Sequence, residues 1–165
     1  MLQLTENEKV LAMVPLKEGT EGYIMMATKN GLIKKTALTE FASIRKVGKI
    51  AISIVEGDEL ISVGLTNGED QVIMASYEGK CIRFSEKDVR PMGRDTQGVK
   101  SITLNDGDYM ADFYPITKDG EVLVASTNSC IKLTTDDIPI FSRGALGNKS
   151  IKLGPLHNVV KISIS

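Results

Sequence analysis

The chain repeats itself with a period of about fifty residues, and this periodicity restricts the possible folds more than any other feature of the sequence. An apolar segment occurs three times, at residues 23–27, 71–75 and 121–125. A polar turn and a second apolar segment follow each copy. Because short apolar segments joined by turns rich in Asn and Gly are typical of β-hairpins, each repeat is predicted to begin with a hairpin.

The second half of each repeat has its own pattern. A connecting loop carries one arginine per repeat, and these arginines are 49 residues apart: Arg45, Arg94 and Arg143. An alternating segment then ends at a Gly-Asp turn in the first two repeats, at residues 52–58 and 102–108. Such alternation indicates further strands, so that a second hairpin is predicted to end each repeat.

These patterns define a domain organisation of three repeats, at about 22–65, 68–114 and 119–165. Residues 1–21 are predicted to be the final hairpin of a preceding blade, because Leu2 and Leu4 match Ile52 and Ile54. One small sheet cannot bury both of its faces alone and must stack on its neighbours. The expected fold is therefore all-β and propeller-like, with about three four-stranded blades and single helical turns at 38–41 and 86–89.

The predicted core consists of the inward-facing apolar residues of these strands. They are Ile24, Met26, Ile33, Ile52, Ile54, Val72, Met74, Ile82, Ile102, Leu104, Val122, Val124, Ile131 and Ile151.

Composition narrows the class of protein. Apolar residues make up 42% and charged residues 25% of the chain, and no apolar run approaches the roughly 20 residues of a membrane helix. Residues 1–8 lack the features of a secretory signal, so a cytoplasmic protein without a membrane partner is expected. The net charge of −1 argues against a uniformly basic chain. Binding of nucleic acid would therefore require cations clustered on one face.

No residue pattern indicates catalysis, a metal or a cofactor. Cys81 and Cys130 are too few for a disulfide scaffold, and their equivalent places in two repeats predict small buried hydrophobic residues. His157 is the only histidine, and the aspartates at 106, 108, 136 and 137 lie at turns where Asp is favoured for local hydrogen bonds. Nucleotide-binding glycine motifs are absent from the sequence, as is a plausible nucleophile-base pair.

Several segments resemble successive blades of the C-terminal domain found in the A subunit of DNA gyrase. These segments are residues 26–36, 56–60 and 82–94, and the resemblance extends over nearly the whole chain. It is weaker in the third repeat, where Ser129 replaces the turn glycine. The A subunit of topoisomerase IV carries a similar domain.

The resemblance implies a β-pinwheel of about six blades that binds and bends duplex DNA around a basic rim. It also implies that the DNA-cleaving tyrosine lies in another domain and that the B subunit hydrolyses ATP, so this chain would have no catalytic residue or cofactor of its own. Its partners would be duplex DNA, the rest of the A subunit, and the B subunit. The family's Q-R-R-G-G-K-G box is missing, and its nearest counterpart is residues 142–147.

The candidate DNA-binding residues are the cations that recur with the repeat. Lys34, Arg83 and Lys132, spaced by 49, are interpreted as one strand position, and Arg45, Arg94 and Arg143 as one loop position. Stacked blades would align each set along one edge, where cations neutralise phosphates without reading sequence. The full predicted set is Lys34, Lys35, Arg45, Lys46, Lys49, Arg83, Arg90, Arg94, Lys100, Lys132, Arg143 and Lys149.

Other interpretations remain open at this point. Recurrent Lys and Arg also keep strand edges soluble, and a protein-interaction propeller without DNA binding is the main alternative function. A non-functional remnant of a longer protein is a third. Three repeats are half of the six-bladed disc that the resemblance implies, which leaves open blade edges. Either a homodimer joins these edges, or residues 1–14 and 152–165 cover them in a monomer.

Overall fold

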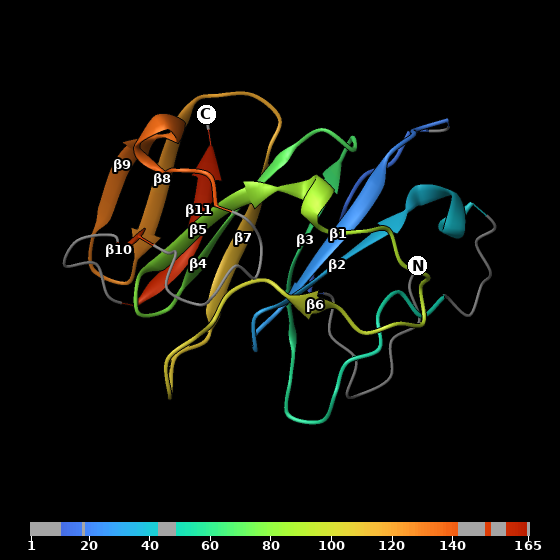
Figure 1. Cartoon of the computed structure of the whole chain (residues 1–165), viewed down its shortest axis with the longest axis horizontal. Coiled ribbons are helices and arrows are strands. Elements are labelled where there is room, and N and C mark those ends of the chain that lie inside the picture. The colour runs from blue at the N-terminus through green and yellow to red at the C-terminus, as the bar shows by residue number, and fades with distance from the viewer. Residues whose placement is uncertain (1–10, 18, 43–48, 142–150, 153–157, 165) are drawn as a thin grey trace.

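The computed structural model describes residues 11–17, 19–42, 49–141, 151–152 and 158–164. Within these ranges the chain is all-β, and its helices are 3-10 turns only. The strands form three antiparallel sheets that follow one another along the chain, as the blue, green and orange ribbons of Figure 1 show. The predicted fold class is confirmed.

The first sheet has the strand order β3-β1-β2-β6. Its strands are β1 (Tyr23–Thr28), β2 (Leu32–Ala37), β3 (Leu60–Thr66) and β6 (Val99–Lys100). The turn between β1 and β2 requires Gly31, which has a φ of 82° that L side chains rarely adopt. This sheet is the first blade.

The second blade has the order β10-β5-β4-β7. Its strands are β4 (Gln71–Ser76), β5 (Lys80–Ser85), β7 (Met110–Ile116) and β10 (Ile151–Lys152). The third blade has the order β11-β8-β9 among the described residues, with β8 (Glu121–Ser126), β9 (Cys130–Thr134) and β11 (Val159–Ile164). The predicted hairpins β1–β2, β4–β5 and β8–β9 are present in all three blades.

The second half of the first two repeats differs from the predicted hairpin. Residues 51–55 and 101–105 form no strands, and the short strand β6 pairs with β2 of the preceding repeat. β10 pairs in the same way with β5. The outermost strand of a blade therefore comes from the next repeat. This close approach requires Gly98, because a Cβ there would lie 2.8 Å from the carbonyl oxygen of Ile33.

The core lies between the blades. One buried cluster joins the first and second blades through Met25 and Ile33 on one side and Met74 and Phe84 on the other. A second cluster joins the second and third blades. The innermost strand β7 lies between β3 and β11, and its Asp112 carboxylate accepts a hydrogen bond of 2.9 Å from the backbone N–H of Ile162.

Eight of the predicted core residues are buried and Ile24, Leu104 and Ile131 are partly buried, but two expectations fail. Ile54 is 43% exposed and Ile52 is only partly buried, whereas the equivalent Ile102 is buried against the first blade. The reason is the strand exchange, since residues 49–55 have no preceding blade among the described residues. Cys130 is also exposed, although Cys81 is buried as predicted. The side chain of Ile151 lies outside the described part.

Short 3-10 turns follow the second strand of each hairpin. They are η1 (Leu38–Phe41), η2 (Glu86–Asp88) and η3 (Thr135–Asp137), and the first two agree with the predicted single turns. In η3 the Asp137 carboxylate accepts a hydrogen bond of 2.7 Å from the backbone N–H of Thr134. This bond, with one from the Thr134 hydroxyl, lowers the pKa of Asp137. Asp137 therefore has the structural role that its turn position indicated.

Candidate nucleic-acid interface

The strand pairing changes which cations are equivalent. Lys35 lies opposite Met25, Arg83 opposite Ile73 and Lys132 opposite Leu123, so these three cations share one position. Lys34, which the spacing of 49 had placed in this set, lies opposite Met26 on the other face of the sheet. A shift of one residue reverses the face of a strand residue. The predicted equivalence of Lys34 with Arg83 and Lys132 is therefore wrong.

Lys34 is fully buried within the repeat structure. Its ammonium group donates hydrogen bonds to the backbone carbonyls of Ala51 (2.8 Å) and Thr96 (3.0 Å), and also to that of Arg94. Burial lowers the pKa of Lys34, an effect that nearby Asp95 opposes and Arg94 reinforces. This cation holds two chain segments together and has no surface with which to contact a phosphate.

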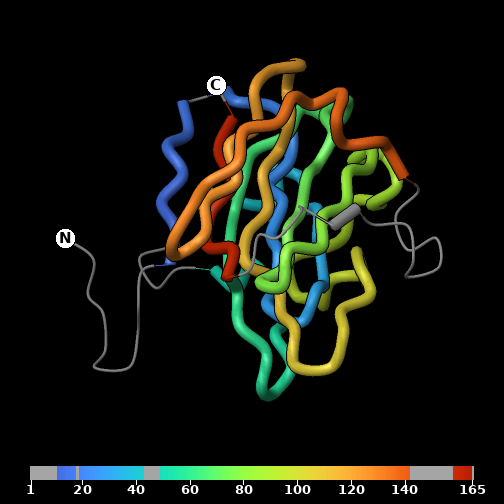
Figure 2. Tube along the Cα trace, turned by 90° about the vertical axis from the view of Figure 1, so that its left-hand side faces the viewer, coloured from blue at the N-terminus to red at the C-terminus, as the bar shows by residue number. Residues whose placement is uncertain are grey.

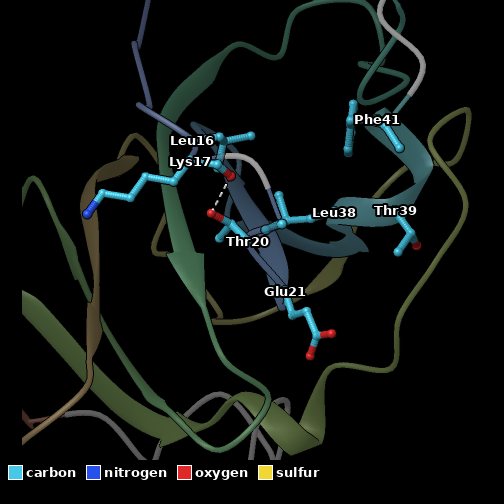
Figure 3. A pocket seen from close by; sticks show the side chains of 9 residues that line it. Leu16, Lys17, Thr20, Glu21, Leu38, Thr39 and Phe41 are labelled. Carbon is cyan, nitrogen blue, oxygen red and sulfur yellow. Dashed lines mark hydrogen bonds between the residues drawn. The ribbon is translucent and has the colours of Figure 1, made fainter.

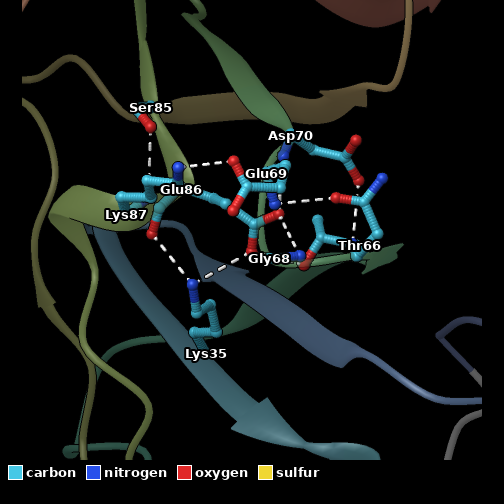
Figure 4. Close-up of polar contacts among 9 residues, drawn as sticks. Lys35, Thr66, Gly68, Glu69, Asp70, Ser85, Glu86 and Lys87 are labelled. Carbon is cyan, nitrogen blue, oxygen red and sulfur yellow. Dashed lines mark hydrogen bonds and ion pairs between the residues drawn. The ribbon is translucent and has the colours of Figure 1, made fainter.

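Lys35 is also buried, in an ion pair of 3.0 Å with the carboxylate of Glu86. Its ammonium lies 4.6 Å from the centre of the Tyr23 ring, a cation–π contact. Glu86 itself is 0% exposed and accepts hydrogen bonds from the Thr66 hydroxyl and the Gly68 backbone N–H, as Figure 4 shows. Lys35 and Thr66 are on strands of the first blade and Glu86 belongs to the second repeat, so this network links the first blade to the second.

Arg83 has the corresponding role one blade later. Its guanidinium donates to the backbone carbonyl of Thr135, to that of Ile138 at 3.3 Å and to the Asp119 carboxylate at 3.1 Å. The residue is only 5% exposed. The expectation that Lys34, Lys35 and Arg83 lie on an exposed DNA-binding edge is thus not met, because protein groups already surround their charges.

Four of the predicted cations remain at least partly accessible along the outer edge of the first blade. Arg90 and Lys100 are exposed, whereas Arg94 and Lys49 are partly buried. The rim segment, which we define as residues 89–100, carries three of the four and ends in β6, the outermost strand of its sheet. The backbone carbonyl of Lys35 anchors it by accepting a hydrogen bond of 2.8 Å from the backbone N–H of Met92.

The fourth cation, Lys49, belongs to the segment that packs against the rim segment. Arg94 donates to the backbone carbonyl of Ile50 at 3.0 Å, and Ser53 donates its backbone N–H to the carbonyl of Thr96 at 3.1 Å. The Lys49 ammonium donates to the carbonyl of Glu40 at 3.2 Å. The tertiary structure therefore brings cations from two repeats to one part of the edge.

The remaining predicted residues do not join this group in the described structure. Lys132 is exposed on the third blade and pairs with Glu121 at 2.6 Å. Arg45, Lys46, Arg143 and Lys149 lie outside the described residues.

Negative charge gathers elsewhere. The turns at 56–59 and 105–108 project at the same end of the molecule, where Figure 2 shows them in teal and yellow below the sheets. They carry Glu56, Asp58, Glu59, Asp106 and Asp108. The rim segment carries one acid, Asp95, against its three cations, so the acidic balance of the whole chain does not prevent a local excess of positive charge along this edge.

A depression beside η1 is the other recess of interest. It is lined by Leu16, Leu38 and Phe41 together with Lys17 and Glu21, as Figure 3 shows. Its lining is mainly apolar and its two charges have opposite sign, which does not match a phosphate-binding site. Within the described residues there is no group of three His, Cys, Asp or Glu side chains able to hold a metal ion.

Sequence reasoning missed the structural importance of Glu86 and Asp119. Both residues lie near turns, where acidic side chains are usually solvated. The one available signal for Glu86 is its position directly after a strand, with Ser85 capping the 3-10 turn by accepting a hydrogen bond from the Lys87 backbone N–H.

A helix long and apolar enough to cross a membrane is also absent from the described part.

Comparison with protein families gives one match that follows the repeats. The family described as the DNA gyrase C-terminal domain, a β-propeller, matches residues 22–67, 70–117 and 120–164. The A subunit of DNA gyrase from Escherichia coli (strain K12) is 44% identical over 162 residues, which is 97% of this chain and 18% of that protein. Its counterpart from Staphylococcus aureus (strain NCTC 8325 / PS 47) is 38% identical over 168 residues, or 98% of this chain and 19% of that one.

Solved structures give the same architecture. A C-terminal domain of DNA gyrase A superposes with a TM-score of 0.82 at 26% identity and covers 98% of this chain and 55% of that domain. The C-terminal domain of DNA topoisomerase IV gives a TM-score of 0.85 at 22% identity over 98% of this chain and 52% of that one. The chain thus spans under a fifth of its sequence relatives and about half of these solved domains.

Proposed function

We propose, from the premise that this chain belongs to the family of DNA gyrase C-terminal β-propeller domains, that it binds and bends duplex DNA without sequence preference. The observation that carries the proposal is the rim segment along the outer edge of the first blade, which carries Arg90, Arg94 and Lys100 and packs through Arg94 against the segment that contains Lys49. Cations on a curved outer edge neutralise phosphates and release counterions, which favours binding to any duplex.

Arg45, Lys46, Arg143 and Lys149 remain part of the proposed interface, because their loops correspond to the rim segment in the repeat pattern. Lys34, Lys35 and Arg83 do not, since their cationic groups are buried against protein oxygens. Lys132 is a separate case because it lies on another blade and already has a carboxylate partner.

The module itself is proposed to be non-catalytic. It would act as part of a type IIA topoisomerase in the cytoplasm, where another domain of the A subunit cleaves DNA, while the B subunit hydrolyses ATP. Its contribution would be to hold and curve a DNA segment near the enzyme, so that binding energy from the rim favours the bent duplex.

Charge reversal on the rim tests this proposal. The Arg90→Glu/Lys100→Glu double variant should weaken binding to all duplexes alike and reduce the slope of log K against log salt by about two. The measurement is a fluorescence titration of two unrelated duplexes of equal length at several salt concentrations. Circular dichroism of the variant checks that the β-fold is intact.

Lys118→Glu is the matched control, since Lys118 is exposed on the turn between β7 and β8 and lies outside the rim segment. We compare it with the single variant Lys100→Glu, which changes the net charge equally. If both variants weaken binding to the same extent, the effect is one of net charge only and the rim is not the site. Unchanged affinity and salt slope in the double variant would also reject it.

A further inference from the structure

The buried ammonium of Lys34 is surrounded by carbonyls of two chain segments that are far apart in sequence. Ala51 provides one acceptor, at 2.8 Å, from the segment that contains Lys49. Arg94 and Thr96 provide two more from the rim segment, Thr96 at 3.0 Å. Only the protonated form of a lysine has three N–H donors. One donor for each of the three carbonyls therefore requires the charged side chain.

The other two blades have no cation at this position. The strand pairing makes Ile82 of the second blade and Ile131 of the third equivalent to Lys34. The same hairpin therefore folds with isoleucine in the other repeats. Burying a charge costs desolvation free energy that isoleucine avoids, so packing alone does not account for the lysine of the first blade.

Arg94 is both an acceptor for this ammonium and a cation of the candidate interface. Its backbone carbonyl accepts from Lys34, while its guanidinium donates to the carbonyl of Ile50 at 3.0 Å. The Thr96 carbonyl accepts the backbone N–H of Ser53 at 3.1 Å as well as the Lys34 ammonium. The place of Arg94 and the contact between the two segments therefore depend on the same buried charge.

We propose that Lys34 is a positioning residue for the rim segment, which it holds against the Lys49 segment so that the cations of both are presented together. This inference rests on the proposed function and adds that affinity for duplex DNA depends on a side chain that is 0% exposed and never contacts a phosphate. Without the ammonium, the carbonyls of Ala51 and Arg94 lose this donor, which favours movement of both segments toward water. Binding would then have to order the cations again, at a cost in affinity.

Lys34→Ile is the primary test, because isoleucine occupies the equivalent place in the other blades. Its urea midpoint should stay close to that of the wild type, whereas its affinity for two unrelated duplexes should fall at least about threefold. Lys34→Met, which keeps a long side chain without the ammonium, should give the same result. Lys118→Gln removes one charge from an exposed turn outside the rim segment and should change the affinity less than about twofold.

A double-mutant cycle with Arg94 separates positioning from direct contact. Arg94→Gln removes a cation that Lys34 positions, so Lys34→Ile should weaken binding clearly less in that background than in the wild type. A phosphate contact made by Lys34 itself, or an effect of net charge, would give the same loss in both backgrounds. Additive losses would therefore contradict the positioning role.

Hydrogen exchange measures the order of the two segments without DNA. The backbone amide of Ser53, which donates to Thr96, should exchange at least about tenfold faster in Lys34→Ile. The amide of Leu38 donates to the carbonyl of Gly22 at 3.0 Å in the same blade and should keep its rate. Faster exchange at both amides would indicate general destabilisation instead of local release.

The binding and exchange measurements have distinct outcomes. If the wild-type chain binds no duplex, the proposed function fails, and the Ser53 amide alone decides whether Lys34 orders the two segments. If the wild type binds DNA and Lys34→Ile binds equally well, or the Ser53 amide is unchanged, the positioning role is wrong and the proposed function stands. Loss of the fold in both Lys34→Ile and Lys34→Met would also overturn it, because Lys34 would then be required by the core as a whole.

Discussion

The second and third blades have nearly the same strand sequences but very different surroundings. β4 reads Gln-Val-Ile-Met-Ala-Ser and is buried along almost its whole length, whereas β8 reads Glu-Val-Leu-Val-Ala-Ser and is buried only at alternate positions. A strand covered on both faces and a strand covered on one face usually differ in sequence pattern. Here they do not, because β8 keeps the pattern of a strand with two covered faces.

The same contrast applies to the cations of the two blades. Arg83 and Lys132 occupy one position, yet Arg83 donates to carbonyls of the following repeat, and Lys132 pairs with Glu121 on its own hairpin. The charge of a strand residue therefore does not determine whether the residue is buried or exposed. Its burial depends on whether a following repeat supplies hydrogen-bond acceptors at that place.

The two junctions between blades also use different carboxylates. Lys35 is held by the fully buried Glu86, while the equivalent Arg83 is held by Asp119, whose side chain is 76% exposed. Thr135 stands where Glu86 stands one repeat earlier and donates its hydroxyl proton to Asp119 at 3.0 Å. The first junction therefore depends on a buried ion pair, and the second on a partly solvated one.

Removing Glu86 should have the largest effect on stability. Glu86→Ala leaves the buried Lys35 ammonium without its carboxylate and should cost about 4 kcal/mol of unfolding free energy. Asp119→Ala, the matched change at the second junction, should cost about 1 kcal/mol or less because water replaces the lost partner. Urea denaturation monitored by circular dichroism measures both. Equal losses would mean that the two junctions do not differ in solvent access.

Truncation of equivalent apolar residues should lower the free energy of unfolding more in the second blade than in the third. Ile73→Ala creates a cavity between two blades and should cost about 3 kcal/mol. Leu123→Ala, measured at low protein concentration, should cost less than about 1 kcal/mol because the side chain is already partly in water. The comparison fails if Leu123→Ala is as destabilising as Ile73→Ala in the monomer.

Replacing the equivalent cations should give the smallest difference. Arg83→Met removes hydrogen bonds to two backbone carbonyls and should cost about 2 kcal/mol, a value reduced by the solvent exposure of Asp119. Lys132→Met loses only a surface ion pair and should change stability by about 0.5 kcal/mol or less. Thermal unfolding at low concentration provides the measurement, and a large loss for Lys132→Met would contradict its assignment to the surface.

Part of the candidate site could be predicted from sequence and part could not. The recurring arginine of the connecting loops predicted that Arg94 and its surroundings belong to the site. A repeat period identifies equivalent loops without knowledge of strand register. The strand cations were predicted wrongly, because the period of 49 grouped Lys34 with Arg83. The strand pairing shows instead that Lys35 is the residue equivalent to Arg83. One residue of error in register moves a side chain to the opposite face of the sheet.

The sequence by itself determined the number of repeats, the hairpins that open them and the turns after Ala37 and Ser85. These features depend on local patterns of apolar residues, glycines and polar turns, which act over a few residues. The tertiary structure alone decided the strand exchange between repeats and the burial of Lys34, Lys35 and Arg83. Whether a lysine or arginine meets water or a backbone carbonyl depends on a segment about fifty residues away along the chain, and no local pattern records that distance.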